Sequence, residues 1–274
     1  MWGGRTRERN PISHAIDVTR PSVARMYDWL LGGKDNYASD RRACAQLLEL
    51  APSTRDLART NRTFLKRVVR ILAEKYGVRQ FIDHGSGLPT QDNVHQVAQS
   101  VDRSARVVYI DNDPMVLAHG RTLLDENDET AVIQADMADT DEIFAHQDVK
   151  RLIDFERPVA ALFVSVLHCL TDEENPAGLV RRVADRLAPG SFVVICQLTS
   201  DDAEFRAEAT AFMHRATGRW GRVRERHEVD AFFAGMAIVP PGLMEVSKWL
   251  PETDLAPRPR SSEWIEYGGV GQVL

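Results

Sequence analysis

The chain has 274 residues, of which 43% are hydrophobic and 27% are charged, and its formal net charge at pH 7 is −6. These values are typical of a globular protein large enough to bury a core, and they exclude an intrinsically disordered chain. Its apolar runs are shorter than the ~18–20 residues needed to span a bilayer, and its N-terminus lacks the apolar stretch of a secretory signal. Three widely separated cysteines do not suggest a disulfide framework. We therefore expect a cytoplasmic protein that is not bound to a membrane.

Basic residues prevail in the first 80 positions, and acidic residues prevail in the rest of the chain. The basic residues are spread through helical patterns, which fits a solvated face or pairing with the acidic remainder; an anionic partner is the alternative. Lys and Arg are not interleaved with aromatic residues, as stacking on bases would require, so nucleic acid is not an expected partner. The oligomeric state stays open.

The opening part of the chain is predicted to be helical. Residues 1–20 read as a flexible arm. Apolar residues then recur at helical spacing from Ser22 to Leu31, and Gly32 and Gly33 end this helix. Two more helices are predicted over residues 39–52 and 54–75, and Gly77 ends the second of them. We expect residues 21–77 to form a helical cap or lid on a domain that spans residues 78–274.

After Gly77 short apolar strands alternate with helices. Such alternation predicts an α/β fold with a mostly parallel, Rossmann-like sheet that is covered on both faces. The last two strands are expected to be antiparallel at one end of this sheet. Strands are predicted over residues 80–83, 106–111, 131–135, 158–164, 191–198, 243–250 and 264–273, and helices over residues 91–99, 114–124, 176–187, 203–217 and 229–233.

Polar residues and glycines follow the first two strands, where an open parallel sheet binds its ligands. The first strand leads into Asp83 and then into the run Gly85-Ser86-Gly87, whose glycines allow the backbone to approach a ligand closely. The second strand ends in Asp111 and Asn112. A carboxylate at this position accepts hydrogen bonds from ribose hydroxyls. A helix cap is the alternative role for Asp111.

Polar residues also follow the third and fourth strands. The third strand is followed by Asp136 and Met137. The carboxylate of Asp136 suits an adenine amino group, and the thioether of Met137 suits packing on the adenine ring. A helix cap is the alternative role for Asp136. The fourth ends in Ser165, near the expected position of a transferred group. Together the four strand ends predict a ligand that contains adenosine.

A dinucleotide is the less favoured form of this ligand. Its fingerprint needs Gly or Ala three residues after Gly87, where the sequence has Thr90 preceded by Pro89. The acidic residue Asp136 also favours S-adenosylmethionine over a nicotinamide cofactor. The combination indicates a Rossmann-like methyltransferase.

The sequence also resembles the S-adenosyl methyltransferase family, long classed as a domain of unknown function. The most specific run is Leu30-Leu31-Gly32-Gly33-Lys34-Asp35-Asn36. The other matching stretches lie within residues 21–37, 61–65, 80–83, 85–90, 93–95, 108–114, 164–170 and 267–271. The resemblance implies a class I methyltransferase fold with an N-terminal helical addition, and it leaves the substrate unassigned. His84 departs from the aliphatic residue expected there.

The resemblance marks Asn61-Arg62, and we expect Arg62 to pair with the methionine carboxylate of S-adenosylmethionine. The N-terminal helices are expected to close over the small-molecule acceptor through a hinge at Gly32 and Gly33. The lid would then bring four side chains to the acceptor or to the methionine end of the cofactor, namely Tyr27, Lys34, Asn36 and Tyr37. Packing of the two tyrosines and plain solvation of Lys34 are the alternatives.

His168, after the fourth strand, is the expected general base because an imidazole titrates near neutral pH. A packed or surface histidine is the alternative. The spacing of histidines and cysteines gives no support to a metal site. The sequence thus predicts a methyltransferase that acts on a hydroxyl or amino group of a small molecule. In one interpretation this small molecule is negatively charged. A noncatalytic sensor of the same cofactor and a nicotinamide oxidoreductase are the competing hypotheses.

Overall fold

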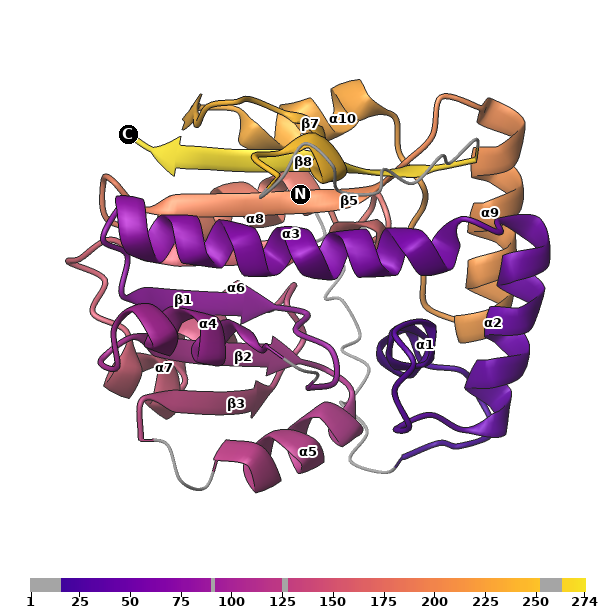
Figure 1. Cartoon of the computed structure of the whole chain (residues 1–274), viewed down its shortest axis with the longest axis horizontal. Coiled ribbons are helices and arrows are strands. Elements are labelled where there is room, and N and C mark those ends of the chain that lie inside the picture. The colour runs from indigo at the N-terminus through magenta and orange to yellow at the C-terminus, as the bar shows by residue number, and fades with distance from the viewer. Residues whose placement is uncertain (1–15, 90–91, 125–127, 252–262) are drawn as a thin grey trace, which may run out of the picture.

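The computed structural model describes residues 16–89, 92–124, 128–251 and 263–274. Thr90 and residues 1–15 of the expected arm lie outside the described residues. The described residues form an α/β fold, in which a mixed β-sheet has helices on both faces and a group of helices at one end (Figure 1). None of the described helices is both long and apolar enough to cross a membrane.

The central sheet has the strand order β3-β2-β1-β4-β5-β8-β6, and β7 pairs with β8 outside this path. The first five strands are parallel, whereas β8 runs antiparallel to β5 and carries β6 and β7, so the predicted fold class is confirmed. The strands are β1 (Gln80–His84), β2 (Arg106–Asp111), β3 (Thr130–Gln134), β4 (Ala160–Val164), β5 (Phe192–Thr199), β6 (Met236–Ile238), β7 (Met244–Glu245) and β8 (Ile265–Val273).

Two apolar layers enclose this sheet because the strands are apolar on both sides. Helices α3 (Thr54–Lys75), α4 (Val94–Val101) and α5 (Pro114–Leu124) cover one face. The other face packs against α6, α7, α8, α10 and the short helix η2. These are α6 (Thr140–Ala145), α7 (Gln147–Leu152), α8 (Pro176–Ala184), α10 (Arg226–Asp230) and η2 (Ala231–Phe233).

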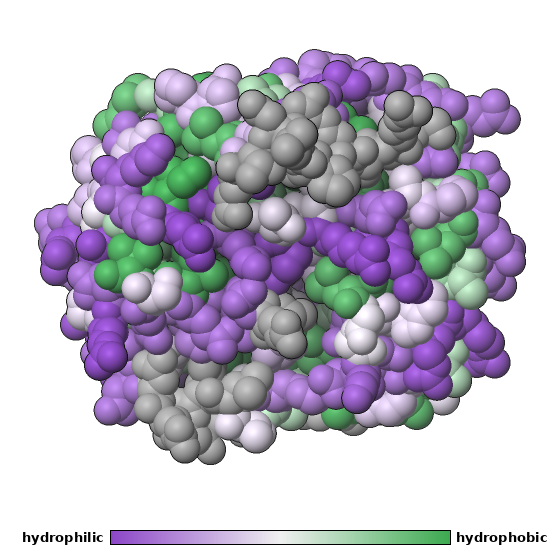
Figure 2. Space-filling model, in the orientation of Figure 1, coloured by the Kyte–Doolittle hydropathy of each residue, from purple (hydrophilic) through white to green (hydrophobic). Residues whose placement is uncertain are grey.

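The third apolar cluster joins α1 (Val23–Leu30), α2 (Ala38–Leu50) and α9 (Ala203–Thr217) at the end of the sheet where the parallel strands terminate (Figure 1). The order of elements along the chain thus places the N-terminal helices beside the expected ligand site. On the face shown in Figure 2, hydrophobic residues form separate small patches among hydrophilic ones.

Some predicted elements differ from the observed ones. The strand expected over residues 243–250 is only β7, because the chain then turns into the short helix η3 (Val246–Lys248) that brings Trp249 against Phe64 of α3. Strand β6 and helices α6 and α7 were not predicted. Each is short, and a short element shows too few turns or alternations for its period to be recognised. The remaining short helix η1 (Leu167–Cys169) follows β4.

A buried ion pair fixes α1 to α2. The Nε atom of Arg25 lies 3.0 Å from Oδ2 of Asp40, and both side chains are almost completely buried. The same carboxylate accepts hydrogen bonds from the backbone amides of Ser22, at 2.9 Å, and Tyr37, at 2.8 Å. Asp40 therefore ties together the start of α1, its middle and the start of α2.

Replacing Asp40 by Asn should destabilise the protein strongly, because it leaves the charge of Arg25 buried without its counter-ion. Loss of one partner of a buried pair costs about 3–5 kcal/mol. The matched control is Asp56→Asn, which breaks an exposed pair with Arg59, worth about 0–1 kcal/mol. Urea unfolding measures both changes. Equal losses of unfolding free energy in the two variants would contradict the role given to Asp40.

Candidate functional site

The backbone of the turn after β1 lies very close to the end of β2 and to the turn after β4. Gly85 and Gly87 have φ angles of +71° and +68°, in the left-handed region that favours glycine. The amides of Gly85 and Ser86 donate to the carbonyl oxygen of Ile110, at 2.8 and 3.1 Å. A Cβ atom on Gly85 would lie 2.2 Å from Cγ2 of Val166. The turns after β1, β2 and β4 are therefore in direct contact.

The carboxylate of Asp111 fixes the geometry of two of these turns. It accepts hydrogen bonds from the amide of Gly87, at 2.8 Å, and from the amide of Asp113, at 2.9 Å. Burial raises the pKa of Asp111 to about 6, against the lowering effect of these amide donors. Asp111 thus has both a structural role at the two turns and a polar surface that faces the site.

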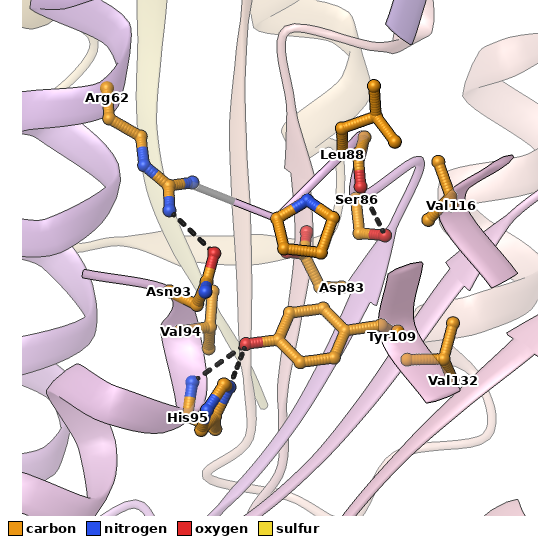
Figure 3. A pocket seen from close by; sticks show the side chains of 13 residues that line it. Arg62, Asp83, Ser86, Leu88, Asn93, Val94, His95, Tyr109, Val116 and Val132 are labelled. Atoms are coloured by element: carbon orange, nitrogen blue, oxygen red, sulfur yellow. Dashed lines mark hydrogen bonds between the residues drawn. The ribbon is translucent and has the colours of Figure 1, made fainter. Parts of the chain in front are cut away.

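Asp83 lies deeper, at the end of β1. Burial raises its pKa to about 7, while the charge of Arg62 lowers it and that of Asp111 raises it. Arg62 reaches over from α3, and its guanidinium donates to Oδ1 of Asn93 at 3.1 Å (Figure 3). A carboxyl group and a guanidinium group therefore lie close to each other beside the glycine turn.

A small side pocket opens beneath this turn. Figure 3 shows Asp83 between Arg62 on one side and Tyr109 on the other. The hydroxyl of Tyr109 accepts a hydrogen bond from the amide of His95 at 2.9 Å and contacts the His95 ring. The pocket has a volume of about 20 Å³, which is room for one water molecule.

A larger cavity lies above the ends of β1, β2, β3 and β4, under α1 and α3, and has a volume of about 490 Å³. This volume is within the range of about 300–1,000 Å³ that is usual for small-molecule sites. Most of the residues singled out from the sequence line this one cavity. They are Tyr27, Arg62, Asp83, Gly85, Ser86, Gly87, Asp111, Asn112, Met137 and Ser165.

His168 does not line the cavity, although Cys169 after it does. Its side chain is 2% exposed, its ring packs against Trp220, and its Nδ1 atom accepts a hydrogen bond from the amide of Leu198 at 3.4 Å. Burial lowers the pKa of His168 to about 3. A ring enclosed in this way is poorly placed to take a proton from a molecule in the cavity, so the geometry gives no support to the expected base.

Asp136 also lies outside the cavity lining. Its carboxylate accepts hydrogen bonds from Arg219, at 2.7 Å, and from the amide of Ala138, at 3.0 Å. Arg219 and Met137 do line the cavity. The contact of Asp136 with adenine stays a prediction, and in this structure the carboxylate is already paired.

The N-terminal helices bring Tyr27 to the cavity, whereas Lys34, Asn36 and Tyr37 do not line it. The turn at Gly32 and Gly33 is held by Asp28, whose carboxylate accepts hydrogen bonds from the amide of Asp35, at 2.9 Å, and from Asn36, at 2.8 Å. A Cβ atom on Gly33 would lie 1.9 Å from the same carboxylate. Gly33 is therefore closely packed, whereas nothing lies within 4 Å of a Cβ atom on Gly32, and the hinge at these glycines stays a prediction.

Residues 16–22 were assigned mainly to the arm, and they instead pass along the cavity. Ser22 donates from its hydroxyl group to Asp113, and Arg25 donates to the carbonyl oxygen of Asp17 at 3.0 Å. Ile16, Asp17 and Arg20 are part of the cavity lining. This placement could not be predicted, because the polar residues of the arm show no periodic pattern.

Two further polar residues at the site were not predicted to have a role there. Asn61 lines the cavity, and its Nδ2 atom donates to the hydroxyl of Tyr27 at 2.9 Å. Glu266 of β8 accepts a hydrogen bond from the hydroxyl of Ser165 at 2.5 Å. A charged residue within an otherwise apolar closing strand was the signal for Glu266. Among the described residues, no group of three or more His, Cys, Asp and Glu side chains is placed to hold a metal ion.

The close contact at Gly85 predicts a large effect of an added methyl group. Gly85→Ala should lose about 1–2 kcal/mol from its left-handed backbone and about 1–3 kcal/mol more from the clash with Val166. Gly77 has nearly the same φ, +68°, but nothing lies within 4 Å of an added Cβ. Gly77→Ala should therefore lose only the backbone part. Urea unfolding would contradict the close contact if both variants lost the same free energy.

The raised pKa of Asp83 predicts that stability falls as the pH rises. The folded protein keeps the Asp83 proton up to about pH 7, whereas the ordinary value is 3.8. The free energy that this group contributes is therefore fully present below pH 4 and is lost as the pH rises through 7. Between pH 5 and 8 the urea midpoint should fall less steeply in Asp83→Asn than in the wild type.

The control for this titration is Asp92→Asn, because Asp92 is exposed beside Lys66 and its pKa is lowered rather than raised. This substitution should leave the slope between pH 5 and 8 unchanged. Parallel curves for the wild type and Asp83→Asn would show that Asp83 is ionised throughout this range.

Comparisons with known proteins agree with this geometry. A sequence profile of the family described as S-adenosyl methyltransferase matches residues 9–273. A crystal structure of a proposed methyltransferase from Thermobifida fusca YX is 39% identical, covers 94% of this chain and 96% of its own, and has a TM-score of 0.87. A DUF574 family protein from Streptomyces avermitilis MA-4680 is 35% identical, covers 94% and 99%, and has a TM-score of 0.86.

A search among curated proteins found no match. The family profile nevertheless covers almost the whole chain, and both crystal structures share its fold over nearly their full lengths. The cavity at the ends of the parallel strands and these similarities lead to one conclusion. The chain belongs to the S-adenosyl methyltransferase family and is an enzyme that uses S-adenosylmethionine.

Proposed function

We propose that this enzyme methylates a hydroxyl or amino group of a small molecule. The observation that carries the proposal is that the glycine turn, Asp111 and Ser165 border the same cavity as Tyr27 and Asn61 of the N-terminal helices. When bound, S-adenosylmethionine supplies a methyl group that is already activated by its sulfonium. The protein therefore has mainly to align the acceptor and exclude water, and alignment contributes about 7–11 kcal/mol.

The residues of the cavity suit the parts of S-adenosylmethionine. Asp111 would accept from the ribose hydroxyls, and Met137 would pack on the adenine ring. The bare backbone at Gly87 leaves space that a side chain would fill, since nothing lies within 4 Å of a Cβ atom there. Asp83 and Arg62 would face the ammonium and carboxylate groups of the methionine end, since each carries the opposite charge. In this orientation the sulfonium would lie toward Ser165.

The size and cover of the cavity favour a small acceptor. The segment 16–22 and helix α1 border it, so a macromolecular chain has less room to enter than a metabolite has. Four arginines and four aspartates line the cavity. This mixture of both signs does not single out the anionic acceptor that the basic N-terminal region suggested.

The alternative is a noncatalytic sensor of the same cofactor. The specific observation in its favour is the contact of Ser22 with Asp113, which ties the start of α1 to the turn after β2 at the border of the cavity. A fixed helix at this place would leave a second substrate less room to enter. Turnover separates the two functions, because a sensor binds S-adenosylmethionine without forming S-adenosylhomocysteine.

Isothermal titration tests the binding part of the proposal. S-adenosylmethionine and S-adenosylhomocysteine should both bind with one site per chain, whereas NAD should not bind because the third glycine position is Thr90. Incubation with a panel of phenols, alcohols and amines should then release S-adenosylhomocysteine above the level without acceptor. Absence of binding would overturn the proposal, and binding without release with any acceptor would favour the sensor.

A pair of variants tests the orientation of the cofactor. Asp111→Asn should weaken S-adenosylmethionine binding at least about tenfold, because hydrogen bonds to a charged group contribute about 1.5–3 kcal/mol. Asp136→Asn should have a smaller effect, because its carboxylate is paired with Arg219. The same titration measures both. A larger loss in Asp136→Asn would mean that Asp136 is a main cofactor contact and that the ion pair opens on binding.

A further inference from the structure

Glu266 is a buried carboxyl group directly behind the cavity wall. It lies on β8, opposite Leu198 of β5, and its exposed fraction is 2%. Its Oε1 atom accepts a hydrogen bond from the hydroxyl of Ser165 at 2.5 Å, and the thiol of Cys196 also lies against this carboxyl group. Burying a carboxyl group among neutral partners costs free energy, so its position calls for a function.

Ser165 connects this carboxyl group to the cavity. It lines the cavity, and its φ of +58° is in the left-handed region that a serine rarely adopts. Its amide is held by the carbonyl oxygen of Cys196 at 2.8 Å. Strained backbone of this kind persists only where the surroundings enforce it, often at functional sites. The strain keeps one hydroxyl group between the cavity and Glu266.

The groups packed around Glu266 are neutral. Cys196 of β5 donates from its thiol to Oδ1 of Asn61 at 3.0 Å, and the hydroxyl of Tyr27 of α1 donates to the carbonyl oxygen of Ala58. Burial raises the pKa of the Cys196 thiol and of Tyr27 far above neutrality. Burial also raises the pKa of Glu266 to about 7, against the lowering effect of its bonds with Ser165 and Cys196.

We propose that Ser165 and Glu266 form the proton-accepting pair of the methyl transfer, and that the acceptor is therefore a group that gives up a proton, a hydroxyl or a protonated amine. This inference rests on the proposed function and deepens it. Ser165 is the residue that contacts the acceptor, and Glu266 is a positioning residue that acts through it. The pair takes the role for which the sequence suggested His168.

The proton and electron balance is complete without another reactant. The acceptor oxygen or nitrogen forms a bond to the methyl carbon as the carbon–sulfur bond breaks and its electron pair stays on sulfur. The acceptor proton passes to the Ser165 oxygen while the Ser165 proton passes to the carboxylate of Glu266. Glu266 returns this proton to solvent after the products leave.

Cofactor binding alone, without a methyl acceptor, tests whether an ionised Glu266 lies near the sulfonium. S-adenosylmethionine and S-adenosylhomocysteine share every titratable group and differ by the methyl group and its positive charge. A positive charge close to a carboxyl group favours ionisation. S-adenosylmethionine should therefore expel more protons from the protein at pH 7 than S-adenosylhomocysteine does.

Titration calorimetry in buffers of different ionisation enthalpy measures this difference. We expect S-adenosylmethionine to release a fraction of a proton more than S-adenosylhomocysteine from the wild type, and we expect Glu266→Gln to abolish this excess. Glu245→Gln is the matched control, since this carboxyl group lies on the neighbouring strand β7, is paired with Lys248 and has a lowered pKa, and the excess should remain. An unchanged excess in Glu266→Gln would overturn the proposal, as would an equal release for both ligands in the wild type.

A measurement on the wild type alone covers the case in which Glu266→Gln does not fold. The ratio of the affinities for S-adenosylmethionine and S-adenosylhomocysteine should rise severalfold between pH 5.5 and 8, with its midpoint near 7. A ratio that does not depend on pH would overturn the pair. Failure of both ligands to bind would instead refute the proposed cofactor site, so the two failures are distinguishable.

Discussion

The carboxylate of Asp111 is the interaction on which the geometry of the site depends. It holds the amides of Gly87 and Asp113 at once, and so it fixes the turn after β1 against the turn after β2. Gly85 extends the same arrangement to β4, because only a residue without a Cβ atom fits against Val166. The cavity forms where these three turns meet, and it owes its shape to hydrogen bonds between backbone and side chain.

Burial of acidic groups gives this cavity its electrostatic character. Asp83, Asp111 and Glu266 are all withdrawn from water, and burial is the largest influence on the pKa of each. Their partners are mainly neutral donors, with Arg62 as the charged one nearby. Such a site favours a ligand that brings its own positive charge. S-adenosylmethionine carries such a charge on its sulfonium and has no phosphate, whereas a dinucleotide cofactor brings a negatively charged diphosphate.

Much of this arrangement was predictable because it follows from local sequence. Continuous apolar strands gave the parallel sheet, and the residues that follow them gave the positions of Asp83, Gly85 and Asp111, since all parallel strands end at one edge. What the sequence could not indicate was the direction of side chains after the strands. Asp136 turns to Arg219, which is 83 residues distant, and His168 turns to Trp220. Such contacts depend on how α9 packs, which no local pattern encodes.

A crystal structure of the protein with S-adenosylhomocysteine would show how the cavity holds the cofactor. We expect the ribose hydroxyls to lie within hydrogen-bond distance of Asp111, the adenine ring to pack on Met137, and the sulfur atom to face Ser165. A ligand bound in the opposite direction, or bound outside the cavity with Asp111 still holding only Gly87 and Asp113, would contradict it.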